Sequence, residues 1–326
     1  MIDFRYHLVS IVAVFLALAV GIVLGTTLLQ EPAVKSAQEW TAQLTEGNKE
    51  LRTQIDTLQG RAAANDALIT SMTPDIVAGD LAGQSVLLIE TPGSSTTIRE
   101  AAQQVLGQAG AEISGRVTLT EKFLDPKGTG VLDGLVNQLK PANMMFPETA
   151  TAWNRAATLL SAALVTSDPA QVGTPNAATT EVLSAFETGG LLSVDGDPGK
   201  RATLVVVLAP EKPFEGENAE AQAGAIASMA DALDVGGKGT VLAGGPAAAT
   251  AVPGDPIGHA RDDSDIAKRV TTVDAGDMPL GRVVIVQSLQ EQLAGRSGHY
   301  GVGIGASAPM PAVPSATPSP TSESGS

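Results

Sequence analysis

The sequence contains no cysteine among its 326 residues. A disulfide framework, a thiolate metal site and a cysteine nucleophile are therefore excluded. Histidine is scarce too, and the three residues are His7, His259 and His299. Because His7 directly precedes a long apolar segment, a catalytic base would have to be His259, His299 or a carboxylate.

Basic residues are few, since 20 Lys and Arg stand against 35 Asp and Glu, for a formal net charge of −15. We expect no nucleic-acid partner, because phosphates would be repelled by this surface. The same charge disfavours adsorption to anionic lipid headgroups. Without the apolar N-terminal segment and the Pro-rich C-terminal tail, roughly 280 residues remain, enough for a sizeable core.

Catalytic and nucleotide-binding motifs are also lacking. The segment from Gly236 to Thr240 resembles a phosphate loop, but glycine follows its lysine and a predicted strand follows the motif, so we interpret it as a turn. Gly301, Gly303 and Gly305 imitate a dinucleotide fingerprint, yet they lead into the Pro-rich tail and not into a helix. The G-x-S-x-G elbow of esterases is absent from the sequence. We therefore predict no enzyme activity.

What the sequence does have is an uncharged run of 22 residues from Leu8 to Leu29. A helix of this length measures about 33 Å and crosses a hydrocarbon core of about 30 Å. We predict that residues 1–30 form a membrane anchor, with the N-terminus cytoplasmic and the bulk of the chain extracytoplasmic in the cell envelope. The sequence does not distinguish an inner from an outer membrane.

A cleaved signal peptide is the alternative, because Ala17-Leu18-Ala19 has the small-x-small pattern of a cleavage site. The apolar run continues ten residues beyond Ala19, and Arg5 is offset by Asp3. Both observations favour a retained anchor.

Residues 31–73 carry a heptad repeat that begins with Val34 at position a. Asn48 falls at another a position, where a buried amide fixes the register and favours two strands. We predict a coiled-coil stalk that forms a parallel homodimer or higher oligomer through a seam of Val34, Leu44, Asn48, Leu51, Ile55 and Leu58. The alternative is a helix that folds back on its own domain, since Gly47 and Gly60 each cost about 1 kcal/mol relative to alanine. We expect Thr73-Pro74 to end the helix.

From residue 80 onward, apolar runs alternate with helical patterns, which is typical of an α/β domain with a parallel sheet. The predicted strands are Ser85–Ile89, Ile113–Leu119, Ala202–Ala209, Gly239–Ala243 and Arg282–Gln287. The predicted helices are Thr97–Ala109, Ala152–Val165, Ala177–Glu187, Ala219–Leu233 and Ser288–Ala294. A Rossmann-like or flavodoxin-like domain is expected over residues 80–305, built from two βαβ halves, before a disordered Pro/Ser/Thr tail at 306–326.

This domain contains one loop and several side chains that could bind a ligand or a metal ion. The loop Thr91–Ser95 follows the first predicted strand, where an α/β sheet places ligands, although capping of the next helix explains it equally well. Met144 and Met145 offer the soft sulfur that Cu(I) prefers, although such neighbours are more often packing residues. His259 lies in a stretch of possible ligands, Gly258–Asp265, which we interpret as a solvated loop whose Asp265 caps a helix. His299 completes the set of candidate metal ligands.

Five segments of the chain together resemble one known family. They are MIDFRYHLVSIVAVFLALAVGIVLG, LRTQIDTL, SVLLIETPG, QAGAEISGRVTLTEKF and GRVVIVQSLQEQLAGRSGHYGVG. In this order they are similar to the actinobacterial copper transport proteins of the MctB type. The resemblance implies an envelope protein of copper efflux or homeostasis, described as an outer membrane channel, with copper as the transported substrate and no tightly bound cofactor. It transfers no ligand residues.

Two functions remain open at this point. The first is copper transport by an oligomer, because one helix per chain cannot enclose a pore. The second is a coiled-coil envelope scaffold that regulates a protein partner, such as a peptidoglycan hydrolase during cell division.

Overall fold

A computed structural model describes residues 4–174, 176–245 and 250–312 of the chain. In the first helix, the side chains of residues 4, 26–34 and 36–38 are outside this description. The chain divides into two compact units, Met1–Asn65 and Asp66–Ser326. They are described separately below.

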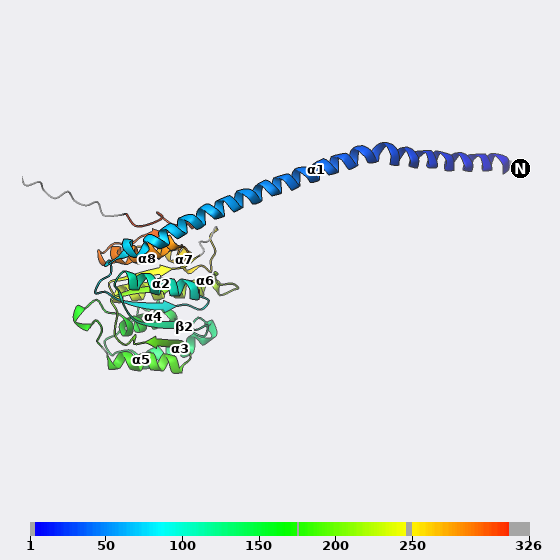
Figure 1. Cartoon of the computed structure of the whole chain (residues 1–326). Coiled ribbons are helices and arrows are strands. Elements are labelled where there is room, and N and C mark those ends of the chain that lie inside the picture. Colours follow the sequence, from blue (N-terminus) through cyan, green and yellow to red (C-terminus); the bar gives the residue numbers. More distant parts are fainter. Residues whose placement is uncertain (1–3, 175, 246–249, 313–326) are drawn as a thin grey trace, which may run out of the picture. The chain divides into compact units, whose positions relative to one another are not determined.

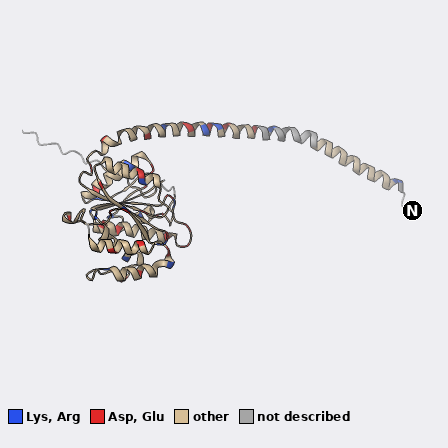
Figure 2. Cartoon of the chain, turned by 60° about the horizontal axis from the view of Figure 1, so that its bottom comes forward, with Lys and Arg blue, Asp and Glu red and all other residues tan. Residues whose placement is uncertain are grey.

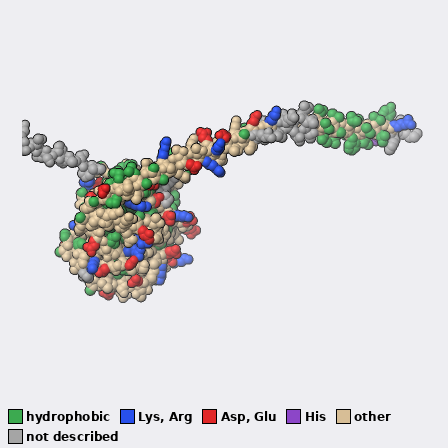
Figure 3. Space-filling view, in the orientation of Figure 1, with side chains coloured by type: hydrophobic (Ala, Val, Ile, Leu, Met, Phe, Trp, Pro, Cys, Tyr) green, Lys and Arg blue, Asp and Glu red, His purple; other side chains and the backbone are tan. Residues whose placement is uncertain are grey.

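The first unit is a single helix, part of α1 (Phe4–Val77), which runs without a break into the second unit (Figure 1). Within it, Arg5–Gly25 is long and apolar enough to cross a membrane. Figure 3 shows hydrophobic side chains covering this end of the helix. The predicted apolar N-terminal helix is therefore confirmed.

Charged residues occur further along α1, after the apolar end of the helix (Figure 2). On this part of the helix the seam residues Leu44, Leu51, Ile55 and Leu58 are all exposed. Asn48 is exposed as well, while the side chain of Val34 lies outside the described residues. Within the first unit, the seam is thus an exposed apolar stripe.

The prediction that α1 ends at Thr73-Pro74 is wrong, because the helix continues to Val77. Proline removes one backbone hydrogen bond from a helix, which tertiary packing can offset. Here Ile69 and Val77 pack against the core of the second unit. The Thr73 hydroxyl also donates to the carbonyl of Ile69 at 2.7 Å. Residues after 65 in α1 therefore belong to the folded domain.

The second unit is built on one sheet of seven strands, in the order β3-β2-β1-β4-β5-β6-β7. The strands are β1 (Ser85–Glu90), β2 (Glu112–Leu119), β3 (Leu192–Gly196), β4 (Leu204–Leu208), β5 (Gly239–Ala243), β6 (Thr271–Val273) and β7 (His299–Tyr300). All neighbours are parallel except β2 and β3. The predicted α/β class is confirmed, with an antiparallel edge strand added.

Helices cover both faces of this sheet. They are α2 (Thr96–Gln108), α3 (Thr129–Leu139), α4 (Ala152–Leu164), α5 (Ala177–Thr188), α6 (Ala219–Gly236), α7 (Pro256–Asp262) and α8 (Pro279–Leu293), with short 3-10 helices at Pro126–Gly128 and Pro169–Gln171. Leu87 and Ile89 of β1 pack in a cluster with residues of α3 to α7. Val86 and Leu88 face the opposite cluster, with residues of α2, α8 and the end of α1. Burial on both faces explains why β1 is uniformly apolar.

The two predicted βαβ halves exist as β1-α2-β2 and β4-α6-β5, and they meet where β1 pairs with β4. The predicted strand Arg282–Gln287 is wrong, because these residues lie inside α8. Val283 to Val286 are all buried in this helix. A short apolar run does not distinguish a buried strand from a buried helix, and here Pro279 begins a helix of 15 residues.

The end of the domain also differs from the expectation. Residues 306–312, assigned to the tail from sequence, lie against the domain. The backbone N–H of Ser307 donates to the carbonyl of His299 at 2.7 Å, and Ala308 pairs with Tyr300. Met310 packs against the core. Residues 313–326 of the predicted tail are outside the described residues.

Gly281 of α8 provides a test of this packing. A Cβ at Gly281 would lie 1.7 Å from the carbonyl oxygen of Ala275. We expect Gly281→Ala to lower the free energy of unfolding by about 3 kcal/mol, because backbone must move. Gly107→Ala in α2 is the control, since its Cβ would meet nothing within 4 Å; it should cause no loss. Chemical unfolding of the full chain in detergent, followed by tryptophan fluorescence, measures both, and equal effects would contradict the packing of α8.

Candidate functional site

The carboxyl ends of β1 and β4 meet where the strand order reverses, the usual ligand site of an open α/β sheet. In this chain the two loops there bond to each other. The backbone N–H of Glu211 donates to the carbonyl of Gly93 at 2.8 Å, and Ser94 pairs with Pro210. Ser95 begins α2, but its side chain makes no cap hydrogen bond. The loop Thr91–Ser95 therefore ties the two halves of the sheet together.

A different cavity, of about 530 Å³, lies next to α7. We call it the α7 cavity. Its floor and lip are apolar, with buried Ile257 and exposed Val252 and Ile304. Its remaining lining carries five carboxylates, the imidazole of His259 and the guanidinium of Arg261; the carboxylates are those of Glu220, Asp255, Asp262, Asp263 and Asp274. Apolar contact and negative charge are thus combined in one depression.

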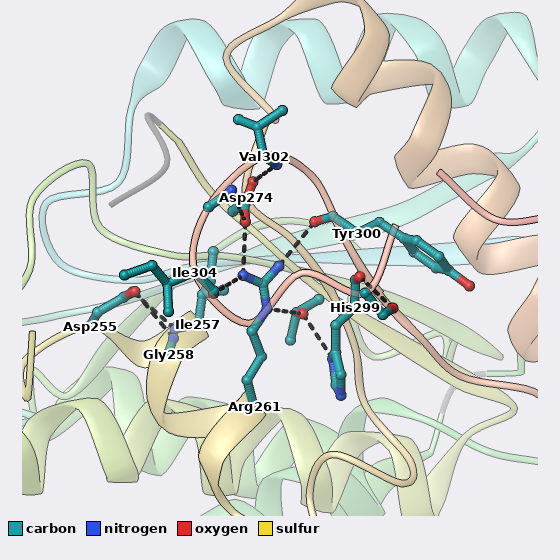
Figure 4. A network of polar contacts seen from close by, with 12 residues as sticks. Asp255, Ile257, Gly258, Arg261, Asp274, His299, Tyr300, Val302 and Ile304 are labelled. Carbon is teal, nitrogen blue, oxygen red and sulfur yellow. Dashed lines mark hydrogen bonds and ion pairs between the residues drawn. The ribbon is translucent and has the colours of Figure 1, made fainter. Parts of the chain in front are cut away.

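Arg261 and Asp274 form a buried ion pair beside this cavity. Their side chains are 4% and 5% exposed, and Nη1 lies 2.8 Å from Oδ2. Figure 4 shows the guanidinium at the centre of a network. It also donates to the Thr272 hydroxyl at 2.9 Å and to the carbonyls of Tyr300 and Ile304 at 3.0 and 2.8 Å. A buried charge pair is stable only when its hydrogen-bonding groups are satisfied in this way.

The loop from Gly301 to Gly305 is fixed by the same carboxylate. The backbone N–H groups of Val302 and Gly303 donate to Asp274 at 2.8 and 3.0 Å. Gly301 has φ +127, and a Cβ there would lie 1.9 Å from Asp274 Oδ1. Of the glycines that imitate a dinucleotide fingerprint, Gly303 therefore binds an internal carboxylate, Gly301 lies against the same carboxylate and Gly305 lies against Arg261.

The interpretation of Gly258–Asp265 as a solvated loop is wrong, because most of it belongs to α7. Asp255 caps this helix by accepting from the N–H groups of Ile257 and Gly258 at 3.0 and 3.1 Å. Asp263, and not Asp265, caps the following turn. These backbone hydrogen bonds lower the pKa of Asp263, so its carboxylate stays charged beside the cavity.

The candidate copper ligands lie in different surroundings. Met144 lines a cavity between α4 and α6, while Met145 is 88% exposed. His259 lines the α7 cavity. Burial lowers the pKa of His299, the charge of Arg261 adds to this effect, and Nδ1 lies 3.0 Å from the Thr272 hydroxyl. Within residues 4–174, 176–245 and 250–312, no group of three or more His, Cys, Asp or Glu could hold a metal ion.

The Arg261–Asp274 pair can be tested by breaking it from one side. We expect Arg261→Met to lower the free energy of unfolding by about 3–5 kcal/mol, because Asp274 is left buried without its countercharge. The control is Lys200→Met, which breaks an exposed pair with Asp197 and should cost less than about 1 kcal/mol. Chemical unfolding of the full chain in detergent measures both. Similar costs for the two variants would contradict a central role for Arg261.

Comparison with known proteins identifies the family. The sequence pattern of the family described as "Copper transport outer membrane protein, MctB" matches residues 1–311. The chain is 31% identical over 312 residues to the protein named copper transporter MctB from Mycobacterium tuberculosis and to that from Mycobacterium bovis, covering 94% of this chain and 98% of each relative. The Mycobacterium leprae protein of the same name is 31% identical over 326 residues, with the same coverage. The chain therefore belongs to the MctB copper transport family.

Proposed function

We propose that this protein takes part in copper transport and copper homeostasis in the cell envelope, and that it works as an oligomer assembled along the seam of α1. The observation that carries the proposal is the exposed stripe of Leu44, Leu51, Ile55 and Leu58 on a helix that also holds the membrane segment. The copper assignment is supported by the names of the family and of its mycobacterial members.

The assembly follows from two physical limits. A stripe of large apolar side chains on an isolated helix gains free energy when a partner helix covers it. One membrane helix satisfies its own backbone but cannot surround a path for an ion. Several further copies would meet both requirements at once, because the seam and the segment Arg5–Gly25 lie on the same helix.

Copper would enter this function as the transported ion. A transported ion needs ligands that bind and release it, and thioether sulfur suits Cu(I). The exposed side chain of Met145 is accessible for such a brief contact, and Met144 is its direct neighbour.

A second candidate function is an envelope scaffold that regulates a partner such as a peptidoglycan hydrolase. The favouring observation is again the exposed seam of α1, because a protein partner could cover it as well as a second copy could. The two functions predict different consequences when the seam is lost.

The assembly is tested by placing charge in the seam. We expect Leu51→Glu with Ile55→Glu to convert the full chain in detergent from an oligomer to a monomer, because like charges would face each other at a and d positions. Thr53→Glu with Thr57→Glu is the matched control, since these exposed residues lie outside the seam and their hydroxyls bond only within the helix. Sedimentation measures the mass, and a monomeric wild type would overturn the proposed assembly.

The choice between the two functions needs a cellular readout. In a strain that lacks the protein, the seam variant should fail to restore copper tolerance, while the Thr53/Thr57 control restores it. Intact copper tolerance together with failed cell separation would overturn the transport function and support the scaffold.

A further inference from the structure

The α7 cavity is bordered by a loop that holds apolar side chains in water. Val302 is 68% exposed and Ile304 is 54% exposed. The backbone between them is fixed, because Val302 and Gly303 donate to Asp274 and the carbonyl of Ile304 accepts from Arg261. Figure 4 shows this loop wrapped around the ion pair, with the Val302 side chain pointing away from Arg261.

Burying an ion pair costs desolvation free energy, and a loop that only faces solvent does not need to be fixed in this way. Rigid apolar side chains on a surface are, however, what a protein interface uses as anchors, because little conformational entropy is lost when they are covered. The lining of the cavity also includes exposed Val252 and buried Ile257. The result is an apolar depression with fixed walls.

The charge around this depression is negative. Arg261 is neutralised by Asp274, so its charge is not available at the surface. Glu220 and Asp262 both line the cavity and are both exposed. Asp255 and Asp263 add two carboxylates that accept hydrogen bonds only from backbone N–H groups. A cationic partner would therefore gain charge complementarity over the whole rim.

We infer that the α7 cavity, which Ile304 lines, and the exposed Val302 of the same loop bind a segment of a partner protein in which aliphatic side chains lie next to lysine or arginine. A small cation inside the cavity would leave Val302 and the outer part of Ile304 in water, whereas a peptide chain would cover them. The chain's own residues 313–326 contain one glutamate and no basic residue, so their charge is wrong for this site.

The test uses two labelled peptides and the full chain in a neutral maltoside detergent. The first peptide has two leucines between two lysines, and the second has glutamates in place of the lysines. Fluorescence anisotropy should show saturable binding of the lysine peptide, weaker binding at high salt, and no binding of the glutamate peptide. Absence of saturable binding of the lysine peptide, or equal binding of both peptides, would overturn the inference.

Variants then locate the site. Ile304→Ser should weaken binding of the lysine peptide about tenfold, because an interface anchor is lost while the backbone bond to Arg261 remains. Glu220→Gln with Asp262→Asn should weaken it too and flatten its salt dependence. Two controls should leave binding unchanged: Val235→Ser, an exposed apolar residue of α6 away from this cavity, and Glu211→Gln with Glu215→Gln in the loop after β4.

Unfolding midpoints equal to that of the wild type establish that each variant is folded. An unchanged affinity in Ile304→Ser, or an equal loss in the control variants, would overturn the inference. Neither result would bear on the seam of α1, because no seam residue is altered in these proteins.

Discussion

The buried Arg261–Asp274 pair is the interaction on which one end of the sheet depends. Each partner is desolvated, and such a pair is tolerated only when nearly every donor and acceptor is satisfied. Arg261 comes from α7, Asp274 follows β6, and their remaining partners are backbone groups of Tyr300, Val302 and Ile304. The ion pair therefore holds α7, the end of β6 and the C-terminal loop together. This additional link explains how β7, a strand of only two residues, stays paired with β6.

The central part of the fold could be predicted because its causes are local. β4 and β5 are buried along their whole length, and the alanine-rich helix α6 lies between them in the chain. Such an order of elements indicates two parallel strands joined by a helix, and it can be read from the sequence. The same rule fails for α8, whose residues Val283–Val286 are equally apolar because this helix is buried all round. β6 was not predicted, since Thr271 and Thr272 are buried polar residues whose partners come from distant positions.

The candidate site was accessible from sequence only in part. Asp255-Pro256 is an N-cap followed by proline at the first helical position, a readable start signal for α7. The role of the glycines from Gly301 to Gly305 was not readable, because it depends on a carboxylate 27 residues before Gly301, at Asp274. The spacing of glycines indicates that the backbone lies close to another group. It does not distinguish a bound phosphate from an internal side chain.

The helix that joins the membrane segment to the seam limits how copper could pass. Arg5–Gly25 and the seam belong to one compact unit and one helix, so in the proposed assembly each chain would bring one apolar helix. Asn48 at an a position favours two strands. Two helices cannot surround an ion path, because a pore needs a closed ring of helices. The proposed oligomer would therefore need either more strands than Asn48 favours or further helices from a partner protein to form an ion path.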